Sequence, residues 1–260
     1  MKKIKIVVNH KKPNARKILQ IAEKLVKEQG FVLSSNPDFI IVLGGDGTLL
    51  AAAEQFGRKR IPIFGVNIGG LGFLTNVPFN DLSPILNEIK NKKFTFEERM
   101  VLAASFNGSH MYALNDITIL TRYPGRAVEF SASIDNEYLC RFIADGIIIA
   151  TPTGSTAYSL ATGGPILLPN TEAIILTPIA PHTLSVRPLV LPARSKIVIT
   201  VGRKGKALIV ADGQRSKLIQ SGIRIQLKKA SYSVRLIKPR RTAFFATLRE
   251  KLQWGGREDA

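Results

Sequence analysis

Cysteine is almost absent from this sequence of 260 residues, which contains only Cys140. A single thiol excludes an internal disulfide, a Cys-rich zinc site and a cysteine-ligated cluster. It also fits a reducing compartment, so we expect a cytoplasmic protein. The three histidines, His10, His110 and His182, are too scattered for a metal-binding motif. The sequence therefore predicts no metal site built from its own side chains.

Long apolar runs and acidic residues are also scarce. No segment approaches the ~20 apolar residues of a membrane-spanning helix, so we expect no membrane partner. The 19 acidic residues are outnumbered by 37 lysines and arginines, which leaves a formal charge of +18. This charge attracts polyanions, but no zinc-finger or RNA-binding aromatic pattern accompanies it. We therefore expect phosphorylated small molecules as partners rather than a specific nucleic acid.

The first third of the chain alternates strand-like and helix-like segments, which is typical of a sheet with parallel strands and covering helices. In the helix predicted over 14–29, apolar side chains at helical spacing share one face, namely Ile18, Ile21, Ala22 and Leu25. The predicted strands are 4–8, 39–43 and 61–66, and the predicted helices are 14–29, 48–56 and 81–91. These segments predict a Rossmann-like α/β domain over residues 1–95.

From about residue 94, short alternating runs are separated by Gly, Pro, Asn and Asp, which is typical of an antiparallel β-sandwich. The runs are 111–121, 127–134, 137–143, 196–201, 207–211, 223–228 and 232–237. We therefore predict a β-sandwich domain over 96–239. A helix predicted over 241–254 would let the last segment, 240–260, pack back on the first domain, although it could equally cap the second.

A glycine-rich loop, Gly44-Gly45-Asp46-Gly47-Thr48, connects the strand at 39–43 to the next helix. Glycines allow close backbone approach to an anion, and a helix N-terminus attracts negative charge. An aspartate there would repel phosphate unless it holds Mg²⁺ or accepts a proton from an attacking hydroxyl, and both roles belong to phosphoryl transfer. Alternatively, Asp46 only caps the helix of an ordinary turn. Walker A spacing and a G-x-G-x-x-G fingerprint are absent.

The GGDGT loop is shared with diacylglycerol and sphingosine kinases, but further segments resemble NAD kinases. These are Gly65-Val66-Asn67 through Thr75, Leu114-Asn115-Asp116, Asp145-Gly146 with TPTGSTAYS at 151–159, APHTLSVRPLV at 180–190, and Asp212-Gly213-Gln214. The resemblance covers most of the chain in the family's order. It implies transfer of a phosphoryl group from ATP or inorganic polyphosphate to the 2′-hydroxyl of the adenosine ribose of NAD, with Mg²⁺ arriving with the phosphates.

The same resemblance implies a role for individual residues. Asp46 is similar to the catalytic aspartate, which accepts the proton of the ribose hydroxyl or orients that hydroxyl. Phe73 resembles the residue whose ring lies against adenine, Asp145 would lie near the nicotinamide end, and Ala180 would approach from a neighbouring subunit. The implied cofactor-binding residues are Gly45, Gly47, Thr48, Asn67, Phe73, Asn115, Asp116, Arg141, Asp145, Thr156, Ala157, Tyr158, Ala180 and Gln214.

Local chemistry adds conditions to these assignments. Adjacent residues on a regular strand face opposite ways, so Asn115 and Asp116 can contact one ligand only at a strand end or bulge. In TPTGSTAYS, the hydroxyl side chains of Thr153, Ser155 and Thr156 can cap the next helix and repeat the anion-binding geometry. Phe73 fits a core aromatic equally well. Ala161 stands where many members of the family have serine.

Two alternatives remain open at this point. A lipid kinase with the same loop would need an apolar pocket and a surface that faces the membrane. A nucleotide-binding protein without catalytic activity would keep the fold, although the intact Asp46 argues against it. The resemblance also implies a homodimer or homotetramer. It leaves open whether the donor is ATP or polyphosphate and whether the acceptor is NAD or NADH.

Overall fold

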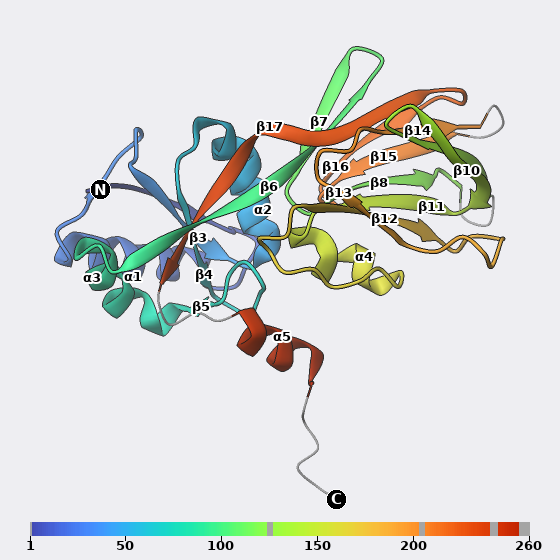
Figure 1. The fold of residues 1–260 in the computed structure, drawn as a ribbon. Helices are drawn as coiled ribbons and strands as arrows, with labels where there is room; N and C mark the ends of the chain where they lie inside the picture. Colours follow the sequence, from blue (N-terminus) through green and yellow to red (C-terminus); the bar gives the residue numbers. More distant parts are fainter. Residues whose placement is uncertain (1, 124–126, 203–205, 240–243, 255–260) are drawn as a thin grey trace, which may run out of the picture. The chain divides into compact units, whose positions relative to one another are not determined.

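The computed structural model describes residues 2–123, 127–202, 206–239 and 244–254. The chain divides into two compact units, which we call unit 1 (1–98 and 234–260) and unit 2 (99–233). Two long strands, β6 (Phe94–Phe106) and β17 (Arg224–Pro239), each run from one unit into the other (Figure 1). Each unit has its own apolar core.

Unit 1 is built on a parallel sheet with the strand order β2-β1-β3-β4. Its strands are β1 (Lys3–Val8), β2 (Val32–Leu33), β3 (Phe39–Gly44), β4 (Ile63–Asn67) and β5 (Val77–Pro78). Strand β17 also pairs with β4, through Leu236 and Ile63. Every residue of β3 is buried, as expected for an apolar strand in a parallel sheet that is covered on both faces.

The described part of unit 1 contains four α-helices. They are α1 (Ala15–Glu28), α2 (Asp46–Phe56), α3 (Leu82–Lys90) and α5 (Phe244–Leu252), with short 3-10 turns η1 (Gly57–Lys59) and η2 (Phe79–Asp81). α1 and α3 share a core with Phe39, Ile41 and Leu43, whereas α2 contacts β3 and β4. Leu49 of α2 lies against Gly65 of β4, which pairs with Val42. Because Val42 points to the opposite face from Ile41 and Leu43, α2 covers the other face. On α1, Ala22 is buried but Ile21 is 41% exposed.

Unit 2 is a β-sandwich of antiparallel strands, as predicted. One sheet has the order β13-β12-β11-β8-β15-β16, and the other contains β10-β9-β14-β17 and the β6–β7 hairpin. The remaining elements are β7 (Ser109–Ala113), β8 (Asp116–Thr121), β9 (Val128–Ile134), β10 (Glu137–Ala144), β11 (Gly146–Ala150), η3 (Thr153–Thr156), α4 (Tyr158–Ala161), β12 (Ala173–Ile179), β13 (Leu189–Pro192), β14 (Ile197–Val201), β15 (Ala207–Ala211) and β16 (Arg215–Ile219). Buried residues of both sheets, such as Ile119 and Phe130, form one core.

The strands of unit 2 differ from the predictions in several places. The run 111–121 is two strands, since β7 ends at Ala113 and β8 begins at Asp116. The runs 223–228 and 232–237 are one strand, β17. Strands β6, β11, β12, β13 and β16 were not among the predicted runs. β11 is buried throughout and β12 at all positions but the last, so both lack the alternation of a half-exposed strand.

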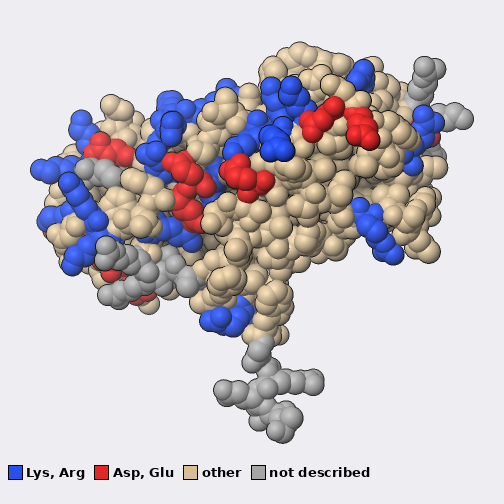
Figure 2. All heavy atoms as spheres, viewed as in Figure 1, with Lys and Arg blue, Asp and Glu red and all other residues tan. Residues whose placement is uncertain are grey.

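Charge and hydropathy agree with a globular protein. None of the described helices is long and apolar enough to cross a membrane. On the face drawn in Figure 2, Lys and Arg side chains form several separate groups with Asp and Glu between them. The positive charge on this face is therefore divided rather than collected in one track along which a nucleic-acid backbone would lie.

Candidate active site

The first part of the site is the loop between β3 and α2. Strand β3 ends at Gly44, Gly45 has an extended backbone, and Asp46 is the first residue of α2. A Cβ on Gly44 would collide with the side chain of Thr48, so only glycine lets the chain turn here from strand into helix. Asp46 is half-buried and Gly47 is exposed. The sequence therefore places a carboxylate at the N-terminus of a helix.

The carboxylate of Asp46 accepts four hydrogen bonds from the loop after β4. Its Oδ2 accepts from the backbone N–H of Phe73 (2.8 Å), and its Oδ1 accepts from the N–H of Leu74 (3.0 Å). The Oδ1 also accepts from both the N–H (2.9 Å) and the hydroxyl (3.0 Å) of Thr75. No side chain caps α2, so the alternative in which Asp46 only caps the helix is wrong. Asp46 instead joins two loops at the same edge of the sheet.

Asn67 shapes the loop after β4 and is only 5% exposed. Its amide NH₂ donates to the carbonyls of Gly70 and Thr75, and its Oδ1 accepts from the N–H of Gly69 at 2.6 Å. A Cβ on Gly72 would run into the Asp46 carboxylate and the Thr75 hydroxyl. The polar atoms of Asn67 are thus used to fold the loop that anchors Asp46.

Phe73 follows this turn, and its ring is half-buried. It contacts the ring of Phe244 on α5, with centroids 6.4 Å apart and an interplanar angle of 41°. The C-terminal helix therefore packs back on unit 1, one of the two positions predicted for it. The contact orients the ring of Phe73 next to the backbone N–H groups of residues 73–75, which donate to Asp46.

Unit 2 joins two segments at Asp212, which lies in the turn between β15 and β16. Its Oδ1 accepts from the N–H groups of Asn115 (2.7 Å) and Asp116 (3.2 Å), and its Oδ2 accepts from that of Leu114 (3.0 Å). Asp212 has a φ of 52°, a left-handed conformation that aspartate tolerates better than most residues. Asp212 therefore holds the short segment between β7 and β8 in place.

Asn115 and Asp116 occupy the strand end that their adjacency required, because β8 begins at Asp116. The buried Oδ1 of Asn115 accepts no hydrogen bond from any described residue. Asp116 is 5% exposed, and Thr118 donates a hydroxyl to it at 3.0 Å. Burial, together with the nearby charge of Asp212, raises the pKa of Asp116 to about 6. Both groups are thus buried acceptors, and the Asn115 oxygen is without a partner among the described residues.

The TPTGSTAYS segment lies against Asn115, but it does not form the capped helix we predicted. Gly154 faces the backbone of Asn115 so closely that a Cβ would not fit, and the hydroxyl of Thr151 accepts the N–H of Gly154 at 3.2 Å. The expected capping by Thr153, Ser155 and Thr156 is wrong. No side chain caps η3 or the four-residue α4, because these hydroxyls bond elsewhere.

Each of the three hydroxyls has a structural partner. Ser155 and Thr156 donate to backbone carbonyls of the same turn, at 2.7 and 3.3 Å, and Thr153 accepts from the guanidinium of Arg99 at 3.2 Å. The second helix N-terminus that could bind an anion is therefore not formed. Tyr158, the first residue of α4, is 43% exposed and available to a ligand.

The other predicted residues of unit 2 lie at two places. Gln214 is exposed in the same turn as Asp212, and its N–H bonds to Ala211. Asp145, in contrast, precedes β11, and its N–H bonds to Ile179, which precedes Ala180. Ala150 at the other end of β11 pairs with Asp116, so Asp145 is five residues, about 16 Å, from the Asp116 end.

Ala180 and Arg141 have different environments. Ala180 has a φ of 45°, which is rare for a residue with a Cβ and worth a functional explanation. Arg141 on β10 is exposed and forms a weak 3.9 Å ion pair with Glu129. Among the described residues, no three His, Cys, Asp or Glu side chains gather in a way that could hold a metal ion.

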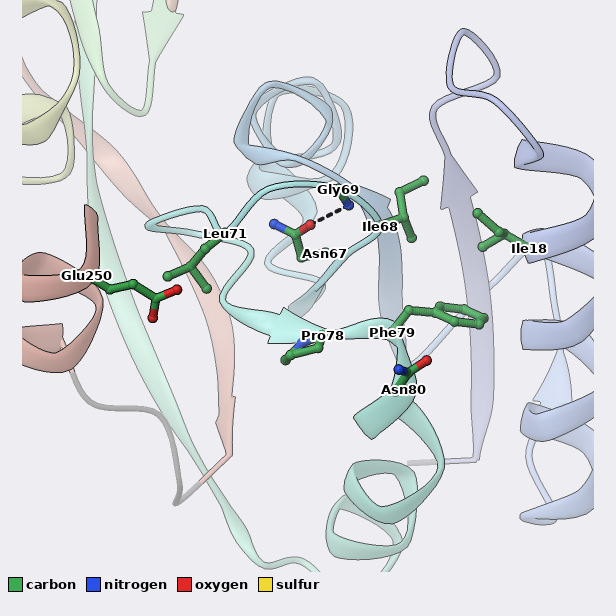
Figure 3. Close-up of a pocket in the computed structure, with 9 residues that line it drawn as sticks. All are labelled: Ile18, Asn67, Ile68, Gly69, Leu71, Pro78, Phe79, Asn80 and Glu250. Atoms are coloured by element: carbon green, nitrogen blue, oxygen red, sulfur yellow. Dashed lines mark hydrogen bonds between the residues drawn. The ribbon is translucent and has the colours of Figure 1, made fainter. Parts of the chain in front are cut away.

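Unit 1 also has a pocket of about 410 Å³, which the sequence did not indicate (Figure 3). It is lined by Ile18, Asn67, Ile68, Gly69, Leu71, Pro78, Phe79, Asn80 and Glu250. Most of these are apolar or isolated polar residues from four separate segments. No motif or periodicity links such residues, so only the folded chain reveals the pocket.

Comparison with known proteins agrees with this architecture. The ATP-NAD kinase N-terminal domain matches residues 31–94, and the ATP-NAD kinase C-terminal domain matches residues 114–239. An NAD kinase of Koribacter versatilis is 44% identical over 237 residues, covering 89% of this chain and 83% of that protein. One of Bacteroides fragilis is 40% identical over 238 residues, covering 90% and 81%. The chain belongs to the ATP-NAD kinase family.

Two solved structures share the fold. The crystal structure of an NAD kinase from Archaeoglobus fulgidus in complex with ATP has a TM-score of 0.82 and 30% identity, and the match covers 96% of this chain and 98% of that one. Yeast NADH kinase complexed with NADH has a TM-score of 0.89, with coverage of 98% and 88%. At 24% identity, the yeast structure supports the fold alone.

Proposed function

We propose that this kinase transfers a phosphoryl group from ATP or inorganic polyphosphate to the 2′-hydroxyl of the adenosine ribose of NAD and so makes NADP. One observation carries the proposal, namely the half-buried Asp46 carboxylate that four donors hold at the N-terminus of α2. The family assignment supports NAD as the acceptor. A lipid kinase is disfavoured, since the similar proteins are NAD kinases.

In the proposed reaction, a bond forms between the ribose O2′ and the γ-phosphorus, and the bond from that phosphorus to the β–γ bridging oxygen breaks. ADP leaves, and Asp46 accepts the hydroxyl proton. A carboxylate has about four acceptor sites, and Oδ1 of Asp46 already takes three donors whereas Oδ2 takes one. Oδ2 is therefore the atom we assign to the hydroxyl. In a loose transition state the proton leaves late, so this fixed position matters more than basicity.

The donor side of the proposal uses Gly45, Gly47 and Thr48 with the N-terminus of α2, where backbone and dipole favour phosphate. Magnesium enters as part of the MgATP substrate, where it neutralises charge on the phosphates. Mg²⁺ is often held by one or two carboxylates and by phosphates rather than by a protein cage.

For the acceptor side, we assign residues 96–239 to NAD binding and residues 1–95 to the donor. Asn115 has a free amide oxygen for adenine, and Asp116 can accept ribose hydroxyls. Phe73 would lie against adenine, while Thr156, Ala157, Tyr158 and Gln214 would line the site. Asn67 supports the NAD site by folding the loop after β4.

Asp145 and Arg141 would contact the nicotinamide end of NAD. An extended dinucleotide can reach this end over about 16 Å.

We further propose a homodimer or homotetramer in the cytoplasm. Ala180 lies at the same end of the sheet as Asp145 and has a strained backbone, which supports a contact role. It would complete the NAD site of a neighbouring subunit. The single cysteine supports a reducing compartment.

Binding of NAD should depend on the protonation of Asp116. Below its pKa of about 6, the carboxyl loses its negative charge, and its protonated oxygen becomes a donor, so it accepts ribose hydroxyls more weakly; we expect the Kd for NAD to rise, by at most about tenfold per pH unit below that value. Above pH 7 the Kd should be constant. Calorimetric titrations from pH 5 to pH 8 measure it, and Asp116→Asn should remove the inflection. An inflection that persists in the variant would assign the titration to another group.

The ionised form of Asp116 should favour NAD binding but lower the stability of the fold. The folded state favours neutral Asp116, so its burial costs nothing below the ordinary pKa of 3.8 and reaches about 3 kcal/mol above pH 6. The free energy of unfolding of wild type should therefore fall relative to that of Asp116→Asn between these values. Denaturant titrations at both ends of the range would show it.

The assay that tests the function supplies purified protein with Mg²⁺, ATP and either NAD or diacylglycerol. We expect NADP and no phosphatidate. Parallel reactions with polyphosphate and with NADH identify the second donor and the second acceptor. Phosphatidate as the only product would establish a lipid kinase, and turnover of neither substrate would favour a nucleotide-binding protein without activity.

A further inference from the structure

We infer that the 410 Å³ pocket of unit 1 binds the adenine base of the phosphoryl donor and that Glu250 recognises the exocyclic amino group of that base. This inference rests on the proposed kinase activity and adds a base-specific donor subsite to it. A polyphosphate chain has no base and would not use the pocket.

The position of the pocket fits a donor nucleotide. Asn67, which lines it, pairs with Gly44 across β3 and β4, and Gly44 begins the GGDGT loop. Leu71, also in the lining, precedes Gly72, whose α-carbon faces the Asp46 carboxylate. A base in the pocket therefore lies next to the loop proposed for its phosphates. Ligands of open α/β sheets commonly bind at this end of the strands.

A cation at the rim supports the same orientation. The amine of Lys12 lies 3.6 Å from the position that a Cβ on Gly69 would take. Gly69 belongs to the pocket lining. An ammonium group there would attract the phosphates of a nucleotide whose base lies in the pocket and whose phosphates extend toward α2.

The walls of the pocket suit a flat aromatic ligand. In Figure 3, Ile18 of α1 and Phe79 lie together on one side, and Leu71 and Glu250 of α5 lie on the opposite side. The volume of about 410 Å³ is within the range of small-molecule sites, ~300–1,000 Å³. A purine between an aromatic ring and aliphatic side chains would bury its apolar faces.

The polar groups of the pocket discriminate between bases. The Asn67 amide is occupied by the loop, whereas Asn80 and Glu250 form no hydrogen bond or ion pair with another residue in the described part of the chain. An ionised carboxylate only accepts hydrogen bonds, and adenine offers a donating amino group at C6. Guanine has a carbonyl oxygen at that position, which Glu250 would repel. The pocket therefore predicts a preference for ATP over GTP.

The family assignment does not imply this subsite. Ile18 and Glu250 lie outside the segments matched by the two family domains, 31–94 and 114–239. Glu250 lies on α5, which is placed against unit 1 by the contact between Phe244 and Phe73. The recognition group comes from a C-terminal helix that neither family domain covers.

The test replaces Glu250 with glutamine, which removes the charge at an exposed position and keeps the shape. We expect the KM for ATP to rise about tenfold at saturating NAD, because the adenine amino group then donates to a neutral amide oxygen instead of a charged carboxylate. The preference for ATP over GTP should fall by a similar factor, since the amide can donate to guanine. The kcat at saturating ATP and the KM for NAD should not change. Asn80→Ala is a second variant, for which a smaller rise in KM is expected.

Two controls separate the possible explanations. Glu28→Gln removes a carboxylate from the other end of α1, where it pairs with exposed Lys24, and should leave all constants unchanged. Inorganic tripolyphosphate competes with ATP but has no base. Its inhibition constant, Ki, should therefore be the same for wild type and Glu250→Gln. If both pocket variants keep the KM for ATP and the ATP/GTP ratio of wild type, the base subsite is wrong and the kinase assignment stands. If wild type makes no NADP, the function fails, and calorimetric titration of the variants with ATP and GTP still decides the subsite.

Discussion

Replacing Asp46 with asparagine is expected to slow NADP formation by about 100- to 10,000-fold, the usual loss when a catalytic base is removed. Asparagine can still direct its oxygen at Leu74 and Thr75, but its NH₂ would face the N–H of Phe73, so one of the four anchoring bonds is lost. We therefore expect a large fall in kcat and a small rise in the Kd for NAD. Single-turnover rates and calorimetry measure the two quantities.

A matched variant separates chemistry from anchoring. Thr75→Val removes only the 3.0 Å bond from the hydroxyl to Asp46 and leaves the backbone donors of the loop in place. We expect kcat to fall less than about tenfold, the value of one such hydrogen bond. A loss as large as that of Asp46→Asn would show that Asp46 acts by holding the loop, and the proton-acceptor role would then be wrong.

Replacing Asp212 with alanine is expected to lower the free energy of unfolding by about 3 to 5 kcal/mol, since three N–H groups lose their acceptor. Alanine also tolerates the φ of 52° poorly. Two effects partly offset the loss, because burial raises the pKa of Asp212 and its charge repels Asp116. With the segment released, Asn115 and Asp116 lose their conformation, and NAD binding should fail. Denaturant titration and calorimetry measure both effects.

Asp212→Asn is the control for this variant. It keeps one acceptor oxygen for Asn115 and Asp116, and asparagine adopts left-handed backbone readily. We expect a loss of only about 1 to 2 kcal/mol, for the bond to Leu114. Equal losses in the two variants would mean that the carboxylate contributes little and that the turn conformation alone decides stability.

Much of the fold could be read from local patterns. The buried run Phe39–Leu43 followed by GGDGT predicts a strand, a tight turn and a helix. The structure has this arrangement, with β3, a turn at Gly45 and α2. Prediction was poorer where a strand had no alternation, as in β12, or where one strand runs from one unit into the other, as in β17. In those places burial and pairing partners come from distant parts of the chain.

The site shows the same division. Asp46, Asn115 and Asp116 could be named from motifs, and their adjacency correctly required a strand end for the last two. Asp212 was noted only as part of a motif, and its role in holding 114–116 depends on a contact across almost a hundred residues. Capping by Thr153 failed because a distant arginine takes its hydroxyl. Side-chain partners outside a segment override its local preference.

By itself, the sequence determined the loop chemistry of this protein, because glycine, carboxylate and helix start lie within five consecutive residues whose backbone geometry is local. It also determined the order of an α/β half and a β-rich half through hydrophobic periodicity. Tertiary structure alone decided which groups anchor Asp46, how strongly burial raises the pKa of Asp116, and that Glu250 lines a pocket with Ile18. These depend on contacts between segments far apart in the chain, and only packing of the folded core brings them within hydrogen-bonding distance.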